Sequence, residues 1–192
     1  MKKLLLGLAL TTLFAAPAFA ALKVGDTAPD FSAVASLGGK EFTFKLNEAL
    51  KKGPAVVYFY PSAYTGGCDL EAHTFAEESD KFATAGATII GVSADDLGRL
   101  HQFSADPKFC AGKFPIASDA DTKIAQSYNL NVTPPREGAK DVNQVAINHA
   151  FIERVTYVIG KDGKILATLS SKTDGLSPDQ HVAKSLEIVS AK

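Results

Sequence analysis

The segment AVVYFYPSAYTGGCDLEAH, residues 55 to 73, joins a run of β-branched and aromatic residues to a glycine-containing loop and then to a polar stretch. An apolar run of this length, preceded by Gly53 and Pro54, is typical of a central strand buried on both faces. From Cys68 to Ala85 the chain contains no Gly or Pro, and apolar residues recur at helical spacing. We therefore expect a buried strand that leads into a helix, with Cys68 at the start of that helix.

Further strands and helices are predicted on both sides of this strand-helix unit. They are a hairpin over residues 31 to 44, a short helix from Asn47, a strand over 88 to 93 followed by a helix, a short strand over 114 to 117, a short helix over 121 to 128, and a hairpin over 155 to 169. Ser177, Pro178 and Gln180 form a helix-start pattern, which predicts a final helix. Strands that alternate with helices in this way predict an α/β sandwich with a mixed sheet. The stretch from Asn129 to Asn148 fits no regular pattern, so we expect a long loop there.

The first 20 residues have the composition of a secretory signal peptide. Lys2 and Lys3 precede the apolar run LLLGLALTTLFAA, and the segment ends in small residues at Ala18 and Ala20. The run is shorter than the about 20 apolar residues that a membrane-spanning helix needs. We predict cleavage after Ala20, export to the periplasm or another exported location, and no membrane attachment afterwards. Residues 21 to 192 are then expected to form a single domain.

The charge and the cysteine content exclude some classes of protein. The chain has 20 Lys and Arg against 21 Asp and Glu, and without Lys2 and Lys3 the net charge is about −3. This balance does not point to nucleic acid or to an anionic membrane as a partner. Two cysteines, Cys68 and Cys110, are too few for a disulfide-scaffolded fold. One structural bridge between them is one alternative, and a chemical role for Cys68 is the other.

The residues around Cys68 favour a reactive thiol. A thiol is nucleophilic as its thiolate, and the unpaired N–H groups at a helix start favour that anion. Gly66 and Gly67 would let the backbone approach a small bound molecule closely, while Thr65 offers a hydroxyl group. Pro61 lacks an N–H, which would keep one edge of the pocket dry. The alternative is that Cys68 is a small apolar residue of the core.

The pattern Pro61-x-x-x-Thr65-x-x-Cys68 after a buried strand resembles the active-site motif of the peroxiredoxins, which are thiol peroxidases. The resemblance extends in order over nearly all of residues 21 to 192, through KVGDTAPDF, VVYFYPSAYTGGC and IERVTYVIGKDGKI. Glu71 resembles the PrxQ, or bacterioferritin-comigratory-protein, branch in particular. The resemblance implies a thioredoxin-like (peroxiredoxin) fold, with a central mixed β-sheet flanked by helices and an N-terminal β-hairpin.

The same resemblance implies roles for individual residues. Arg154 falls where the family keeps an arginine over the catalytic sulfur, so its charge would lower the pKa of the Cys68 thiol. Arg154, Thr65 and the N–H groups of Gly67 and Cys68 would hold a peroxide. Attack on the O–O bond would leave water or an alcohol, and a sulfenic acid on Cys68. Glu71 would orient the loop by accepting a hydrogen bond rather than act as a general acid.

Cys110 is the internal candidate for the second thiol of the reaction. Its surroundings resemble PrxQ members whose resolving cysteine lies on the helix after the second core strand, and His73 occupies the nearer position that other members use. The resemblance implies an atypical 2-Cys mechanism with an intramolecular Cys68–Cys110 disulfide, for which the first helical turn would unwind. It also implies a peroxide substrate, a thioredoxin-like or other dithiol reductant, a monomer and no cofactor.

Other functions of a thioredoxin-like fold fit the sequence less well. A thiol-disulfide exchanger needs a C-x-x-C pair at the helix start, and a copper-handling domain also needs paired cysteines. His73 and His101 do not form a recognised ligand set with Cys68, so we predict no metal site. The remaining alternative is a periplasmic thioredoxin-like binding module in which a static Cys68–Cys110 disulfide has a structural role.

Overall fold

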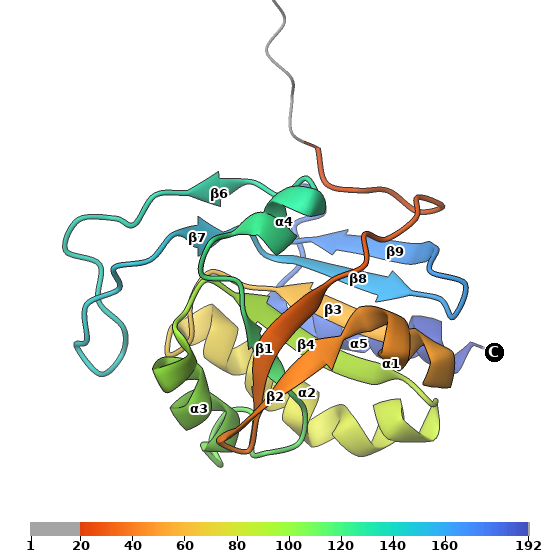
Figure 1. Ribbon diagram of the computed structural model, residues 1–192, viewed down its shortest axis with the longest axis horizontal. Helices are drawn as coiled ribbons and strands as arrows, with labels where there is room; N and C mark the ends of the chain where they lie inside the picture. Colours follow the sequence, from red (N-terminus) through yellow and green to blue (C-terminus); the bar gives the residue numbers. More distant parts are fainter. Residues whose placement is uncertain (1–19, 192) are drawn as a thin grey trace, which may run out of the picture.

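The computed structural model describes residues 20 to 191 and is built on a seven-stranded sheet in the order β2-β1-β5-β4-β3-β8-β9 (Figure 1). Its strands and those of a separate β6-β7 pair are β1 (Ser32–Leu37), β2 (Lys40–Lys45), β3 (Ala55–Phe59), β4 (Thr88–Ser93), β5 (Ile116–Ser118), β6 (Val132–Thr133), β7 (Phe151–Ile152), β8 (Val155–Ile159) and β9 (Ile165–Ser170). The helices are α1 (Leu46–Lys52), α2 (Gly66–Thr84), α3 (Leu97–Ala105), α4 (Lys123–Ser127) and α5 (Pro178–Ser190). Apart from Ala20, the predicted signal peptide lies outside the described residues.

The sheet is mixed, as the sequence predicts. Strands β3, β4 and β5 are parallel neighbours, whereas β8 pairs antiparallel with β3, and β9 with β8. The predicted N-terminal hairpin is formed by β1 and β2, and its turn has Gly38 and Gly39 at φ values of +56° and +80°. Positive φ at both turn residues is the conformation that glycine adopts most easily. Both predicted hairpins are therefore confirmed.

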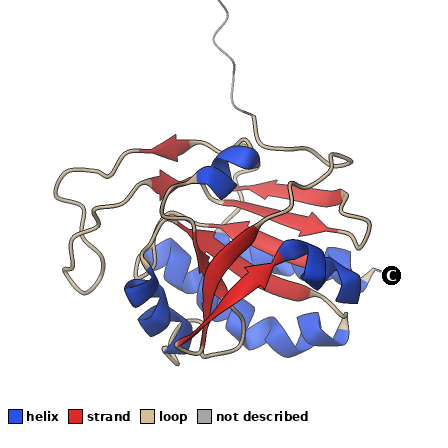
Figure 2. Cartoon of the chain, in the orientation of Figure 1, coloured by secondary structure: helices blue, strands red, loops and turns tan. Residues whose placement is uncertain are grey.

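Helices cover the two faces of the sheet, and Figure 2 shows them on both sides of the strands. The side chains of β3 alternate, so Val57 and Phe59 join one buried cluster while Val56 and Tyr58 join the other. The first cluster includes residues of α1 and α4, and the second includes residues of α2, α3 and α5. All five residues of β3 are buried, which confirms the prediction of a central strand. Cys68 belongs to the cluster under α2, α3 and α5.

The irregular stretch predicted from Asn129 to Asn148 contains one short strand, β6, and is otherwise loop. Residues 134 to 150, which we call the 134–150 loop, connect β6 to β7 and project from the side of the molecule (Figure 1). Lys140 and Ala146 form an isolated antiparallel bridge within it. Ile147 is 4 % exposed, so this loop is anchored to the rest of the protein by at least one buried side chain.

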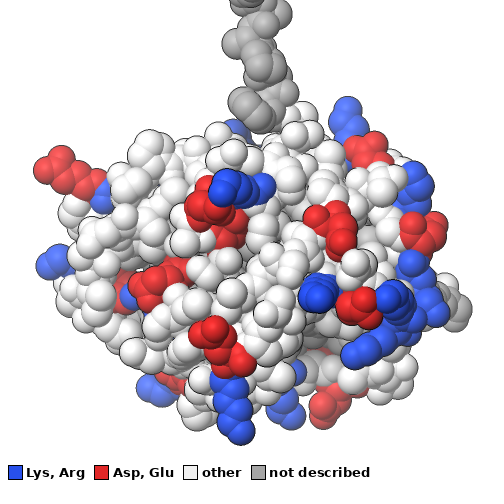
Figure 3. Space-filling view, in the orientation of Figure 1, with Lys and Arg blue, Asp and Glu red and all other residues white. Residues whose placement is uncertain are grey.

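Acidic and basic side chains are interspersed on the face of the molecule that Figure 3 shows. The chain contains nearly equal numbers of the two kinds, and neither gathers into an extended patch on this face. Among the helices of residues 20 to 191, none combines the length and the apolar character that a membrane span needs.

Candidate active site

Cys68 lies in the first turn of α2 and is almost completely enclosed. Thr65 has an extended backbone and is the N-cap of the helix, and its carbonyl oxygen accepts a hydrogen bond from the Cys68 N–H at 2.8 Å. The Cys68 residue is 2 % exposed. Its N–H is therefore already bonded in this conformation and is not available for the predicted contact with peroxide. Gly67, one position earlier in the first turn, supplies the other N–H of the predicted pair.

Arg154 reaches the Cys68 sulfur from the short connection between β7 and β8. Its Nη2 atom donates to the sulfur at 3.0 Å, and its Nη1 atom donates to the Glu71 carboxylate. A Cβ atom on Gly67 would lie 3.2 Å from Nη2, so the glycine leaves room for the guanidinium. The fold thus brings Cys68, Gly67, Glu71 and Arg154 together, although 86 positions separate Cys68 from Arg154.

The pKa of the Cys68 thiol is raised in this conformation, although Arg154 acts to lower it as the sequence predicts. Burial of the sulfur is the main cause, because a thiolate loses its hydration in the core. The charge of Arg154, the Thr65 hydroxyl and the main chain of Ser62 all act in the opposite direction. The effect predicted for Arg154 therefore has the expected direction, but burial of the sulfur outweighs it in this conformation. The groups that favour the thiolate are in place, and Ser62 is one that sequence reasoning missed.

Thr65 and Pro61 line a cavity of about 450 Å³ that Ile147 and Phe151 also border. The Thr65 hydroxyl donates its proton to the Ser62 carbonyl oxygen at 2.7 Å. A hydroxyl carries one proton, so Thr65 must turn away from Ser62 before it can donate to a peroxide. Pro61 is half-buried and lies beyond the end of β3.

Glu71 is completely buried beneath the guanidinium of Arg154. One carboxylate oxygen accepts from Arg154, and the other lies 3.5 Å from the hydroxyl of Thr156 on β8. Burial raises the pKa of Glu71 to about 7, although the charge and hydrogen bond of Arg154 oppose this rise. Glu71 therefore accepts a side-chain donor, as predicted, and it does so far from water.

His181 is a buried member of this region that sequence reasoning missed. Its Nδ1 atom lies 2.9 Å from the Thr156 hydroxyl and 3.9 Å from Glu71, and its Nε2 atom lies 3.0 Å from the Ser171 hydroxyl. Burial and the nearby charge of Arg154 lower the pKa of His181 to about 4, so the imidazole is neutral near pH 7. Nothing in the local sequence marks His181, because the contact depends on how α5 packs.

Cys110 lies in a segment of turns after α3 and not on the helix, which corrects the position that the resemblance implied. The helix ends at Ala105 because Asp106 precedes Pro107, and a residue before proline disfavours the helical conformation. Cys110 is completely buried in the same apolar cluster as Cys68. Both cysteines are free thiols, so the static bridge of the binding-module alternative is not formed.

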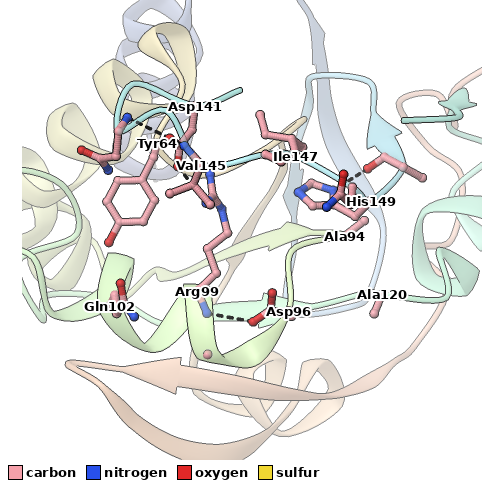
Figure 4. Close-up of a pocket in the computed structure, with 15 residues that line it drawn as sticks. Tyr64, Ala94, Asp96, Arg99, Gln102, Ala120, Asp141, Val145, Ile147 and His149 are labelled. Carbon is pink, nitrogen blue, oxygen red and sulfur yellow. Dashed lines mark hydrogen bonds and ion pairs between the residues drawn. The ribbon is translucent and has the colours of Figure 1, made fainter. Parts of the chain in front are cut away.

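A second cavity, of about 880 Å³, lies between α3 and the 134–150 loop (Figure 4). Tyr64, Arg99, Asp141 and His149 are among its lining residues. None of the site residues predicted from the sequence lines it, although Tyr64 adjoins Thr65 in the chain. Over residues 20 to 191, no group of three or more His, Cys, Asp or Glu side chains is arranged to hold a metal ion.

Comparison with known proteins gives a family match over most of the chain. The profile described as "AhpC/TSA family" matches residues 24–168. The chain is 30 % identical over 171 residues to a putative peroxiredoxin of Mycobacterium tuberculosis, with coverage of 88 % of this chain and 97 % of the relative. It is 31 % identical over 164 residues to the putative peroxiredoxin bcp of Coxiella burnetii, with coverage of 85 % and 95 %.

Solved structures agree with this match. The crystal structure of the peroxidoxin BcpB from Mycobacterium tuberculosis has a TM-score of 0.72 and 29 % identity, and the match covers 88 % of this chain and 97 % of that one. A structure of the bacterioferritin comigratory protein of Xanthomonas campestris, a protein described as having alkyl peroxide reduction activity, has a TM-score of 0.63 and 26 % identity. That match covers 82 % of this chain and 90 % of that one. The predicted thioredoxin-like peroxiredoxin fold is confirmed.

Proposed function

The chain belongs to the AhpC/TSA family of peroxiredoxins, and from this premise we propose that it is a thiol peroxidase in which Cys68 is the peroxidatic residue. The observation that carries this assignment is the 3.0 Å contact between the Arg154 guanidinium and the Cys68 sulfur. A permanent positive charge at that distance stabilises the thiolate and can donate to a peroxide oxygen. The second Arg154 bond, to Glu71, fixes the direction in which the guanidinium points.

In the first step the Cys68 thiolate attacks one oxygen of the peroxide and the O–O bond breaks. The sulfur is oxidised to a sulfenic acid, and the departing oxygen takes up a proton and leaves as water or an alcohol. Arg154, the Gly67 N–H and a reoriented Thr65 hydroxyl stabilise the charge that develops on the oxygens. Pro61 lines the same cavity as Thr65.

In the second step the Cys110 thiol attacks the sulfenic acid, which forms the Cys68–Cys110 disulfide and releases water. The first turn of α2 unwinds for this step, since bonded cysteines need Cα atoms within about 7 Å and both side chains are enclosed in the core. A thioredoxin-like or other dithiol reductant then returns both cysteines to thiols. This is the atypical 2-Cys cycle.

The match to the bacterioferritin comigratory protein supports membership of the PrxQ branch. The alkyl peroxide reduction described for that protein supports alkyl hydroperoxides beside hydrogen peroxide as substrates. The composition of residues 1 to 20 supports an exported form that is cleaved after Ala20. We propose a monomer that acts in the periplasm or another exported location. Mass determination of the mature protein and size-exclusion chromatography test the cleavage site and the monomeric state.

Peroxide consumption by the reduced protein tests the catalytic assignment. We expect the wild type to consume one equivalent of peroxide rapidly, Cys68→Ser to consume none, and Cys110→Ser to form a sulfenic acid that a dimedone-type reagent traps. The intramolecular disulfide should form in the wild type and in neither variant. If Cys68→Ser keeps the full rate of peroxide reduction, the proposed function is wrong.

A further inference from the structure

Asp95, which follows β4, binds the main chain that precedes the peroxidatic helix. It is completely buried, and its Oδ2 atom accepts the Ala63 N–H at 2.9 Å. Its Oδ1 atom lies 2.8 Å from Arg99 Nε and 2.9 Å from His149 Nε2. Asp95 is therefore the point where α3 and the 134–150 loop meet the segment that leads to Cys68.

Arg99 completes the fixation of the same segment from α3. Its Nη2 atom donates to the Ala63 carbonyl oxygen at 2.7 Å, and its Nη1 atom pairs with Asp141 at 2.8 Å. The guanidinium also lies 5.1 Å from the centre of the Tyr64 ring. Both main-chain polar groups of Ala63 are thus bound by buried or nearly buried charged side chains, which are the strongest hydrogen-bonding partners.

The 134–150 loop is shaped to offer its charged residues to this network. The Asp141 carboxylate accepts the N–H groups of Asn143 and Val145 at 2.8 and 2.9 Å, and the Val142 N–H donates to the Tyr64 carbonyl oxygen at 3.0 Å. Figure 4 shows Arg99 extending from α3 toward the part of the loop that carries Asp141 and Val145, with His149 at the other side of the cavity.

The segment held in this way has backbone strain and directly precedes Thr65, the N-cap of the helix that carries Cys68. Tyr64 has φ of +56°, which is unfavourable for a bulky side chain and persists where surrounding contacts fix it. The Ser62 hydroxyl lies 3.2 Å from both Asp95 and His149, while the Ser62 main chain acts to lower the pKa of the Cys68 thiol. A shift of residues 62 to 64 would therefore move the Ser62 main chain, which favours the Cys68 thiolate, and the Ser62 carbonyl oxygen that accepts from Thr65.

We propose that Asp95, Arg99 and His149 are positioning residues that fix residues 62 to 64 and thereby set the reactivity of the Cys68 thiol. The inference rests on the proposed peroxidase function and gives the 134–150 loop a role in it. Of these three residues, His149 belongs to the 134–150 loop. Its contact with Asp95 therefore requires the loop to be packed against the rest of the protein.

Protonation of His149 links the network to pH. Burial would lower the pKa of His149, but the hydrogen bond and charge of Asp95 outweigh this and raise it. The charged and titratable groups around the pair are Arg99, which faces both residues, Asp141, which binds Arg99, and Tyr60, which lies near Asp95. The imidazolium is present at low pH and is lost as pH rises through its raised pKa.

His149→Ala and His149→Gln test the proposal, with His73→Gln on the exposed surface of α2 as the matched control. Each reduced protein is assayed for the rate of Cys68 oxidation by peroxide, for the pH dependence of Cys68 alkylation by iodoacetamide, and for amide exchange at residues 62 to 64. We expect His149→Ala to slow oxidation about tenfold or more, since small displacements near a reacting group have effects of this size. His149→Gln, which keeps a neutral donor to Asp95, should keep most of the wild-type rate above the pKa of His149. Below that pKa, where the wild type has an imidazolium beside Asp95, the variant should react more slowly than the wild type.

Faster amide exchange at residues 62 to 64 in His149→Ala, with His73→Gln unchanged, is the result that supports positioning. Wild-type oxidation and alkylation kinetics in a folded His149→Ala protein would overturn it. If His149→Ala does not fold, the pH profile of the wild type against His149→Gln decides, and identical profiles overturn the proposal. Alkylation and exchange do not require turnover, so the proposal and the peroxidase assignment fail separately.

Discussion

Two buried carboxylates lie on the two sides of Cys68 along the chain: Asp95 binds Ala63 before the helix, and Glu71 belongs to the helix itself. Their pKa values shift in opposite directions. Glu71 lies in α2 beside Arg154, and burial raises its pKa to about 7. Asp95 lies after β4 beside Arg99 and His149, and although burial acts in the same direction, its hydrogen bonds hold the pKa below the usual range. Each carboxylate has an arginine and a histidine nearby, so the residue types alone do not explain the difference.

The number of close hydrogen-bond donors explains why the two pKa values shift in opposite directions. Asp95 accepts from His149, from the Ala63 N–H, and from the Ser93 hydroxyl at 2.7 Å, and it forms an ion pair with Arg99. Glu71 accepts from Arg154 and has only a distant hydroxyl at its other oxygen. A carboxylate with several donors stays ionised in the core, whereas one with a single donor holds its proton more tightly. The first arrangement suits a fixed anchor, and the second suits a site whose charge balance changes during reaction.

Removal of the arginine on the Glu71 side should have the largest effect. We expect Arg154→Met to slow Cys68 oxidation about 100-fold or more, since loss of a donor to a developing oxyanion has this size. The pKa of the Cys68 thiol should rise further, because the charge that opposes burial is gone. Stopped-flow oxidation and pH-dependent alkylation measure both effects, with Lys184→Met on the exposed side of α5 as the control. A rate near that of the wild type would contradict the assignment of Arg154.

Substitution of the two carboxylates by amides should have different effects on the free energy of unfolding at Asp95 and at Glu71. We expect Asp95→Asn to lower the free energy of unfolding by about 3 kcal/mol, since it leaves the partly buried Arg99 and His149 with a weaker partner. Glu71→Gln should cost about 1 kcal/mol near pH 7, because its carboxyl group is already partly protonated there. Urea unfolding at pH 7 measures both values. Equal losses of unfolding free energy in the two variants would contradict the proposed difference between Asp95 and Glu71.

The pH dependence of stability should show the same contrast. Glu71 has a raised pKa, so its contribution falls as pH rises from 4.5 to about 7, whereas His181 has a lowered pKa and its contribution grows between about 4 and 6.5. The contributions of Glu71 and His181 oppose each other, so Glu71→Gln should make the free energy of unfolding rise more steeply with pH below 6.5.

His149 has a raised pKa, so its contribution to stability is complete below pH 6.5 and is lost as pH rises through that pKa. Urea midpoints from pH 4.5 to 8 measure these slopes.

The smallest predicted effect concerns the space around the guanidinium. A Cβ atom on Gly67 would lie 3.2 Å from Arg154 and 3.4 Å from Pro178, so Gly67→Ala should displace Arg154 slightly. We expect this displacement to slow Cys68 oxidation about a few-fold, because the rate depends on the position of the groups around the reacting atom. Gly66→Ala, whose Cβ would meet nothing within 4 Å, is the matched control. Equal rates in the two variants would show that the guanidinium adapts without loss.

Much of the fold was predictable because local patterns and the fold agree. The buried strand β3, the helix that carries Cys68, both hairpins and the capped start of α5 follow from apolar runs, turn glycines and the Ser177 to Gln180 pattern. Element ends were less accurate: α2 begins two residues before Cys68, and α3 ends before Cys110. Tertiary contacts decide such ends more than local preference does.

The sequence by itself determined the chemistry that is available: a thiol at a helix start, a hydroxyl three residues before it, and an arginine beside a late strand, in an order that matches the peroxiredoxins. Only the tertiary structure decided that Glu71 meets His181 and that Asp95 meets Arg99 and His149, because those contacts join segments far apart in the chain. The tertiary structure also decided the sign of each pKa shift. That sign depends on burial and on the number of donors within hydrogen-bond distance, and neither is a local property of the chain.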